Sequence, residues 1–265
     1  MLINESPLRV RPLRAFSDNY IWLIDAPQAP GRIVVVDPGD AEPVRAELHR
    51  SGASLAAILL THHHPDHIGG VEALRAAAPV PVFGPDDARI PNLSRRLRDG
   101  ETLQLPDLGL QFQIMHIPGH TLSHIAFWGH TSVFCGDTLF SAGCGRMFEG
   151  TPVQMSASLQ RLSALPPATR VFAGHEYTAA NLRFAEAADP GNEAAARYRE
   201  LVDALRAKDT PTLPSTIALE NRVNPFLRCD DAAIRAAAQR HSGRALDDRV
   251  AVFAELRAWK DGFRA

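Results

Sequence analysis

The feature that most constrains this chain is a dense cluster of potential metal ligands directly behind an apolar run. Residues 56–60 read AAILL, and residues 61–67 read THHHPDH. The apolar run predicts a buried strand, and the polar residues predict a loop at its end. Such a loop can aim alternate side chains at one centre, and imidazole with carboxylate is a ligand set for zinc, iron or manganese. The cluster therefore predicts a metal site at a strand end.

Further potential ligands stand at three later predicted strand ends. His120 ends the sequence IPGH, Asp137 follows FCG, and His175 follows FAG. The glycine before each residue lets the backbone turn tightly or approach a site closely. With the first cluster the chain offers five histidines and two aspartates: His62, His64, Asp66, His67, His120, Asp137 and His175. Seven ligands exceed the needs of one tetrahedral ion but suit two ions that share a bridging carboxylate.

The secondary-structure pattern changes along the chain. The first two thirds alternate short β-rich runs with turns, and the predicted strands are 33–36, 57–60, 80–83, 112–117, 125–128, 132–135 and 171–173. Predicted helices lie at 70–78 and after Thr151-Pro152, where threonine can cap and proline can occupy the first turn. This mixture favours a layered α/β or α+β architecture.

From about Glu176 the sequence becomes rich in Ala, Arg, Glu and Leu, with predicted helices at 192–208, 231–241 and 247–260. The two prolines of TPTLPS at 210–215 interrupt this helical tail. The shift in composition predicts a domain boundary near residue 175. We therefore expect a metal-binding catalytic domain at residues 1–175 and a helical domain at residues 176–265.

Composition excludes several classes of protein. A hydrophobic fraction of 45% is typical of a compact globular chain, and a net charge of −2 gives no electrostatic reason to bind nucleic acid or an anionic membrane. No apolar run reaches the length of a membrane span, and the N-terminal residues lack the apolar core of a secretory signal, so we expect a cytoplasmic protein. A chain of 265 residues can bury its own core, so we also expect a monomer. The three cysteines show no CxxC spacing and are expected to be buried packing residues.

The complete ligand pattern resembles the metallo-β-lactamase superfamily. This resemblance implies an α+β fold, the αββα sandwich, followed here by a C-terminal α-helical domain. It also implies one metal ion on His62, His64 and His120 and a second on Asp66, His67 and His175, with Asp137 as the bridge. The ions are two divalent metals, with zinc the first expectation and iron or manganese as alternatives, since all three accept these ligands.

Several other segments resemble glyoxalase II, the hydroxyacylglutathione hydrolase. They are residues 134–150 (FCGDTLFSAGCGRMFEG), 174–185 (GHEYTAANLRFA), 220–228 (ENRVNPFLR) and 257–261 (RAWKD), so that the likeness extends over essentially the whole chain. The resemblance implies hydrolysis of S-D-lactoylglutathione to D-lactate and glutathione, in methylglyoxal detoxification, by a hydroxide that bridges the two ions. Asp66 and Asp137 are then the catalytic carboxylates, and Asp37, at another strand end, is a candidate to orient a ligand histidine.

The same resemblance places five side chains around the glutathione part of the substrate: Arg146, Phe148, Tyr177, Arg257 and Lys260. Cationic side chains are suited to the carboxylates of glutathione. The family commonly has lysine at the position of Arg146 and tyrosine at that of Phe148. The first difference keeps a cation, whereas the second removes a hydroxyl and predicts weaker glutathione binding or a shifted substrate preference.

Other functions are compatible with parts of this pattern. The nearest alternative is another thioesterase or a lactonase of the same fold. A mononuclear iron dioxygenase would use fewer of the ligands, and a metallonuclease would be expected to carry a basic extension that this chain lacks. A metal-stabilised binding protein without turnover is a further alternative, which an assay for thioester hydrolysis would distinguish.

Overall fold

The computed structural model describes residues 7–264. Within them the backbone divides into two compact units. The first unit comprises residues 7–116 and 123–136, and the second comprises residues 117–122 and 137–264. Each unit has its own hydrophobic core. No helix among residues 7–264 is long and apolar enough to cross a membrane.

The first unit contains a sheet whose strands follow one another in chain order. The strands are β1 (Val10–Ala15), β2 (Asn19–Asp25), β3 (Arg32–Val36), β4 (Ser54–Leu59), β5 (Val82–Pro85) and β6 (Arg95–Leu97). Strands β1 to β3 pair antiparallel, whereas β3 to β6 pair parallel. Because the carboxyl ends of parallel strands meet at one edge, the residues that follow β3 and β4 lie close together. The backbone N–H of Asp37 donates to the carbonyl of Leu59 at 2.9 Å.

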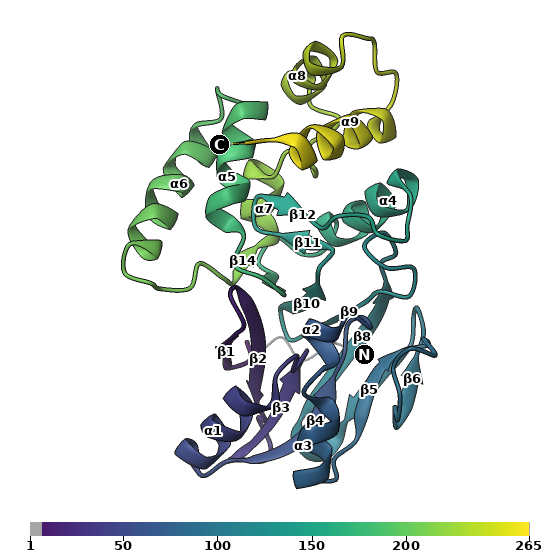
Figure 1. Cartoon of the computed structure of the whole chain (residues 1–265), viewed down its shortest axis with the longest axis vertical. Coiled ribbons are helices and arrows are strands. Elements are labelled where there is room, and N and C mark those ends of the chain that lie inside the picture. The colour runs from purple at the N-terminus through teal and green to yellow at the C-terminus, as the bar shows by residue number, and fades with distance from the viewer. Residues whose placement is uncertain (1–6, 265) are drawn as a thin grey trace. The chain divides into compact units, whose positions relative to one another are not determined.

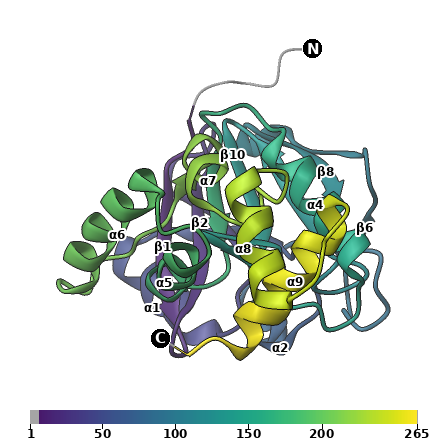
Figure 2. The same cartoon turned by 90° about the horizontal axis from the view of Figure 1, so that it is seen from above.

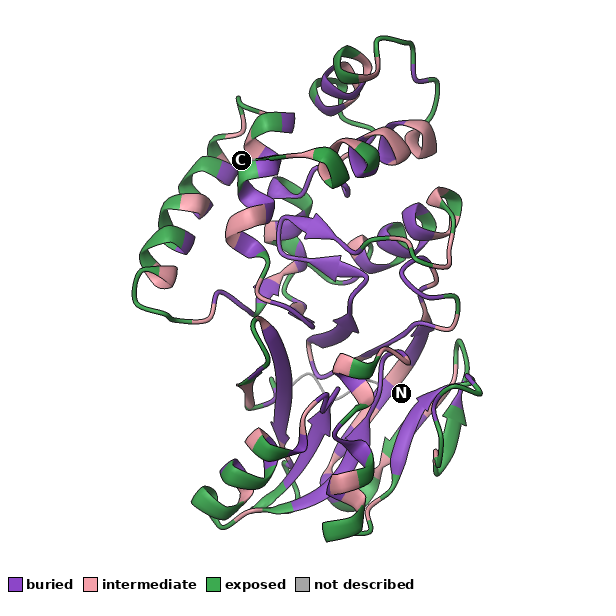
Figure 3. Ribbon diagram, viewed as in Figure 1, coloured by how far each residue is buried: buried purple, intermediate pink, exposed green. Residues whose placement is uncertain are grey.

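Strand β3 is buried on both faces, which explains why its residues 33–36 are all apolar rather than alternating. Ile33 and Val35 pack in one core with helices α1 (Ala41–Ser51) and α3 (Val71–Ala77). Val34 and Val36 point to the opposite face and are equally buried. Figure 1 shows α1 and α3 beside this sheet, and Figure 3 shows that the exposed residues of α1 lie on its outer side.

The remaining strands of the first unit form an antiparallel meander. They are β7 (Thr102–Leu105), β8 (Leu110–His116), β9 (Ile125–Gly129) and β10 (Ser132–Gly136), and the 3₁₀ turn η1 (Pro106–Leu108) joins the first two. The rings of Phe127 and Phe134 both contact Phe112 edge to face inside this unit. The N–H of Ile125, at the start of β9, donates to the carbonyl of Thr61 at 3.0 Å. The meander is thereby tied to the loop that follows β4.

The second unit combines two antiparallel strand pairs, β11 with β12 and β13 with β14, with most of the helices. Its elements are β11 (Leu139–Phe140), β12 (Gly143–Cys144), α4 (Pro152–Ser163), β13 (Arg170–Ala173), α5 (Thr178–Ala188), α6 (Glu193–Arg206), β14 (Ser215–Thr216), α7 (Ile217–Val223), α8 (Ala232–Ser242) and α9 (Arg249–Gly262). Helix α4 begins with a capping box, in which the Thr151 hydroxyl accepts from the N–H of Gln154 and Oε1 of Gln154 accepts from the N–H of Thr151. Helices α8 and α9 pack against each other, and Figure 2 shows them side by side.

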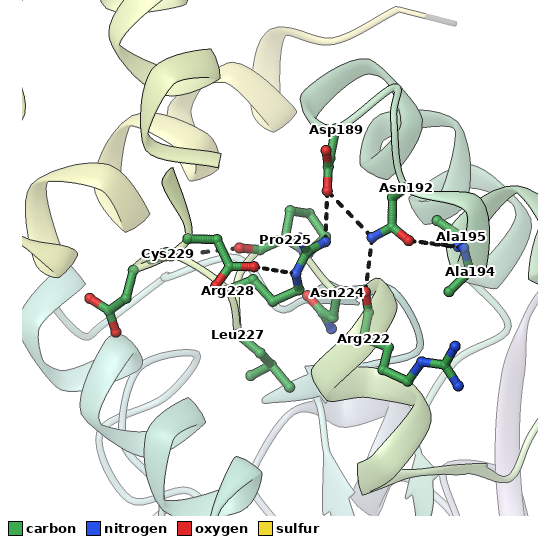
Figure 4. A network of polar contacts seen from close by, with 12 residues as sticks. Asp189, Asn192, Ala194, Ala195, Arg222, Asn224, Pro225, Leu227, Arg228 and Cys229 are labelled. Atoms are coloured by element: carbon green, nitrogen blue, oxygen red, sulfur yellow. Dashed lines mark hydrogen bonds and ion pairs between the residues drawn. The ribbon is translucent and has the colours of Figure 1, made fainter. Parts of the chain in front are cut away.

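A polar network joins the ends of three helices in the second unit (Figure 4). Asp189, which ends α5, accepts from the guanidinium of Arg228 at 2.8 Å. Asn192 caps α6 through its Oδ1, and its Nδ2 donates to the carbonyl of Arg222 in α7 at 2.9 Å. One asparagine therefore satisfies free donors at the start of one helix and a carbonyl near the end of another.

A second network surrounds the fully buried carboxylate of Glu220 in α7. It accepts from the hydroxyl of Ser141 and the N–H of Ala142, both at 2.8 Å, and from Nδ2 of Asn224 at 3.1 Å. Burial raises the pKa of Glu220, although these donors oppose the rise. Ala142 has a φ of 55°, in the left-handed region, so the carboxylate holds a strained turn between β11 and β12.

The strands and helices expected from the sequence are confirmed, with ends that differ by at most three residues. The capping role of Thr151 and the burial of all three cysteines are also confirmed. The elements that were not predicted are β1, β2, β6, β7, β11, β12, β14, α1 and α2 (Pro65–Ile68), because they are short or their apolar residues follow neither a clear alternation nor a long helical period. The elements α5 and α7 lie within the tail that was expected to be helical, but their separate bounds were not predicted.

Candidate metal centre

The histidine-rich loop begins directly after β4 and leads into the one-turn helix α2 (Pro65–Ile68). Nε2 of His62 and Nδ1 of His64 lie 3.1 Å apart. His62 is fully buried and stacks on the ring of His124 with centroids 4.6 Å apart. Two nitrogens on one tetrahedral zinc ion would lie roughly 3.3 Å apart, given Zn–N distances of about 2.0–2.1 Å. The separation of these two nitrogens therefore fits two ligands of a single ion.

Asp37, at the end of β3, fixes the orientation of two of these histidines. Its Oδ1 accepts from the N–H of Thr61 at 2.8 Å, and its Oδ2 accepts from the Thr61 hydroxyl at 2.7 Å. Because that hydroxyl donates to Asp37, its oxygen is left to accept from Nδ1 of His62 at 3.0 Å. Asp37 Oδ2 also lies 3.1 Å from Nδ1 of His67. A carboxylate is only an acceptor, so both imidazoles carry their proton on Nδ1 and leave Nε2 for a metal.

Asp66 and His67 form a second pair of converging ligand atoms within the first unit. Oδ2 of Asp66 lies 3.5 Å from Nε2 of His67. Asn19, the first residue of β2, donates from Nδ2 to the same Oδ2 at 3.0 Å. Gly39 packs against this loop so closely that a Cβ there would lie 1.8 Å from the carbonyl oxygen of Asp66. The Asp37-Pro-Gly turn thus needs glycine at its third position to let the loop approach.

The second unit gathers its three expected ligands around one carboxylate oxygen. Oδ2 of Asp137 lies 3.5 Å from Nε2 of His120 and 3.2 Å from Nε2 of His175. Nδ1 of His120 donates to the carbonyl of Arg146 at 2.8 Å, which leaves Nε2 available as the ligand atom. A Cβ on Gly145 would lie 1.9 Å from the carbonyl of Asp137, so only glycine permits this chain path. An oxygen shared by two imidazoles has the position expected of a bridging ligand.

The donor atoms fit a divalent metal in their chemistry as well as in their spacing. The seven side chains offer imidazole nitrogens and carboxylate oxygens, and no cysteine is among them. Histidine and aspartate side chains grouped in this way can hold divalent metal ions.

Two exposed aromatic side chains border the expected ligands of the second unit. The ring of Tyr177 stacks on His175 with centroids 4.8 Å apart and an interplanar angle of 7°. The ring of Phe148 contacts His120 edge to face at 5.2 Å and is 65% exposed. Both residues were predicted to contact substrate, and both present apolar surface next to an expected metal ligand.

The three cations expected near the substrate lie together in the second unit, but their surroundings differ. Arg257 is buried and donates to the carbonyl of Cys144 at 2.9 Å and to Asp261 at 2.9 Å. Arg146 is largely exposed and lies 3.4 Å from the same carboxylate. Burial, together with the positive charge of Arg257 and its arginine neighbours, lowers the pKa of Lys260. The group carries more positive charge than Asp261 neutralises, which favours an anionic ligand.

Sequence reasoning missed one residue that supports an expected ligand. Asn19 was not recognised, because an asparagine before an apolar run is common in turns, yet its side chain holds Asp66. His124 is also buried beside the ligands, and its ring stacks on His62. The signal that would have found Asn19 is a polar residue that starts a fully buried strand.

Known proteins resemble the chain over nearly the whole of its length. Residues 15–175 match the family model of the metallo-β-lactamase superfamily, and residues 176–263 match that of the hydroxyacylglutathione hydrolase C-terminus. A hydroxyacylglutathione hydrolase of Alkalilimnicola ehrlichii is 54% identical over 248 residues, which cover 93% of this chain and 96% of that protein. One of Nitrosomonas eutropha is 48% identical over 255 residues, which cover 96% of this chain and 99% of that protein.

Among solved structures, ETHE1 from Myxococcus xanthus aligns with a TM-score of 0.65 at 26% identity and covers 96% of this chain and 90% of its own. The structure of TTHA1623 in a di-iron-bound form aligns with a TM-score of 0.59 at 29% identity, covering 82% of this chain and 100% of its own.

The fold and the clustered histidines and aspartates define a member of the metallo-β-lactamase superfamily with an added helical C-terminal region. This confirms the α+β fold class expected from the sequence. Within that superfamily, the chain belongs to the hydroxyacylglutathione hydrolase family, also known as glyoxalase II, a family of metallohydrolases.

Proposed function

We propose that this protein hydrolyses S-(2-hydroxyacyl)glutathione, with S-D-lactoylglutathione as the substrate and D-lactate and glutathione as the products. The observation that carries the proposal is the position of Asp137 Oδ2, which lies within 3.5 Å of an imidazole nitrogen of both His120 and His175. The names of relatives that are about half identical over nearly the whole chain support the substrate.

The metal-binding residues follow from the pairs of converging atoms. We assign one ion to His62, His64 and His120 and a second ion to Asp66, His67 and His175, and the bridge to Asp137. Zinc is the first candidate for both ions. Iron, which is bound in the di-iron form of TTHA1623, is an alternative along with manganese. Two such ions, when bound, would supply Lewis acidity that lowers the pKa of water and polarises the thioester carbonyl.

The residues of the chain position the reactants. Asp37 accepts from Nδ1 of His67 directly and, through the Thr61 hydroxyl, also orients the Nδ1 proton of His62. Asp66, held by Asn19, accepts a hydrogen bond from the attacking water and aims it at the carbonyl carbon. Addition of that oxygen and cleavage of the C–S bond give the carboxylate and a thiolate. Because a thiol has a pKa of about 8.5, the thiolate leaves without a dedicated general acid.

We assign the glutathione part of the substrate to Arg146, Phe148, Tyr177, Arg257 and Lys260. Arg146 and Lys260 provide the charge that the carboxylates of glutathione need, and a bound carboxylate would offset the mutual repulsion of the cations. Two guanidinium nitrogens of Arg257 are already used by Cys144 and Asp261, so its contribution is mainly its charge. Phe148 offers only its ring, without the hydroxyl of a tyrosine.

We further propose that residues 1–175 carry the catalytic metal ligands, that residues 176–265 complete the substrate site, and that the protein acts as a cytoplasmic monomer. The ranges of the two matched family models support this division.

The test measures thioester hydrolysis by purified, metal-loaded protein. It compares S-D-lactoylglutathione with a lactoyl thioester that lacks glutathione and with a lactone. We expect a strong preference for the glutathione thioester, loss of activity in Asp137→Ala, and full activity in the exposed control Asp107→Ala. Hydrolysis of the lactone alone would contradict the proposed substrate and favour the lactonase alternative.

A further inference from the structure

One exposed aromatic side chain of the first unit has no part in the proposed site. Phe16 is 61% exposed, and no other large apolar side chain among the described residues of this unit is exposed. The other exposed aromatic residues, Phe148 and Tyr177, lie against expected metal ligands and are assigned to glutathione. The acyl group at the other end of the thioester has no assigned apolar contact.

Phe16 is also held in an unfavourable backbone conformation. It follows β1 in the short turn to β2, which is closed by the pair Ala15 and Asn19. Its φ is 52°, in the left-handed region, which a bulky residue rarely adopts and which asparagine or glycine adopts readily. Because Phe16 is mostly exposed, its ring buries little apolar surface that could offset this strain, and strained residues of this kind concentrate at functional sites.

The position of this turn places Phe16 beside an expected metal ligand. A Cβ built on Gly39 would lie 3.0 Å from Cε2 of Phe16 and 1.8 Å from the carbonyl oxygen of Asp66. The ring edge and Asp66 therefore lie against the same face of Gly39. At the other end of the turn, Asn19 donates to both the carboxylate and the carbonyl of Asp66. The turn is thus anchored on Asp66 by contacts within one unit.

We propose that Phe16 contacts the acyl group of the substrate and sets the preference among 2-hydroxyacyl groups. This inference rests on the proposed function. An aromatic ring at this place favours an acyl group with an apolar or aromatic substituent, because the two apolar surfaces are removed from water together. A phenyl substituent should benefit more than the methyl group of lactate.

The test compares two glutathione thioesters that differ only in the acyl substituent, S-D-lactoylglutathione and S-D-mandeloylglutathione. The variant Phe16→Asn removes the ring and suits the left-handed backbone, so its melting temperature should equal or exceed that of the unsubstituted protein. The matched control is Leu201→Ala, which truncates an exposed apolar residue on α6. A second readout, independent of turnover, is calorimetric binding of S-benzylglutathione and S-methylglutathione.

We expect Phe16→Asn to lower kcat/KM for the mandeloyl thioester, relative to the lactoyl thioester, by at least twofold and up to about tenfold. The relative affinity for the benzyl thioether should fall in parallel, and Leu201→Ala should change neither ratio. A change of less than twofold in both ratios, or an equal change in the control, overturns the role of Phe16. Absence of hydrolysis of either thioester by the unsubstituted protein overturns the proposed function itself, and this inference with it.

Discussion

Replacing Asp37 with asparagine is the most direct test of how the chain prepares its ligands. The change is isosteric, and Oδ1 of the new amide can still accept from the N–H of Thr61. The amide nitrogen then takes the place of Oδ2, which accepts from the Thr61 hydroxyl and faces Nδ1 of His67. Since an amide NH₂ only donates, His67 must lose this hydrogen bond or move its proton to Nε2. Either change weakens His67 as a ligand.

The size of the effect can be worked out in two ways. A hydrogen bond to a charged group contributes about 1.5–3 kcal/mol. Loss of a residue that orients a metal-bound histidine typically lowers metal affinity about 10- to 100-fold, which corresponds to roughly 1.4–2.7 kcal/mol. The two values agree, because both describe the same contact between Asp37 and His67. We therefore expect Asp37→Asn to bind metal about 10- to 100-fold more weakly than the unsubstituted protein.

The assay is competition for metal against a chromophoric chelator, with metal content of the purified protein as a second measure. The control is Asp40→Asn, three residues along the chain, where Asp40 caps α1 and asparagine caps equally well. Asp40→Asn should leave metal affinity unchanged. If Asp37→Asn retains its metal affinity within twofold, the orientation of His67 by Asp37 does not matter for binding and the reasoning is refuted.

Three further predictions concern other parts of the chain. The hydrogen bonds of Arg50 and Arg11 lower the pKa of Glu47 to about 2, so its contribution to stability is present above its unfolded pKa of about 4.5 and is lost as the pH falls toward 2. Glu47→Gln should therefore lower the free energy of unfolding at pH 7 by less than about 3 kcal/mol, because water screens the charge of the exposed Arg50. The difference in denaturant midpoint between this variant and the unsubstituted protein should vanish near pH 2. Lys260→Gln should raise KM for S-D-lactoylglutathione about 10-fold with little change in kcat, and an unchanged KM would argue against its role in binding. Glu220→Gln should lower the free energy of unfolding, measured by chemical denaturation, by about 2–4 kcal/mol, because the NH₂ of the new amide would face hydrogen-bond donors that the carboxylate accepts from. A free energy of unfolding within about 0.5 kcal/mol of that of the unsubstituted protein would contradict this.

The seven ligands could be proposed from the sequence because their chemistry and their local setting are short-range properties. The residues around His62 show a strand, a loop and a ligand motif within a dozen positions. The shape of the turn at Phe16 was not predictable, since phenylalanine has no preference for a left-handed backbone and this conformation is imposed by its surroundings. Likewise, Asn19 acquires its role only because β2 places it beside a carboxylate that lies 47 positions away in sequence.

The sequence by itself determined the α+β class, the helical tail, the identities of the seven expected ligands and the resemblance to one family, because residue type and spacing carry this information. Only the tertiary structure decided which atoms converge. It showed that the pairing of β3 with β4 places Asp37 against Thr61 and His67, and that Asp137 presents one oxygen to two imidazoles. These contacts join positions that are far apart in the chain, so they depend on strand register and packing, which no local pattern encodes.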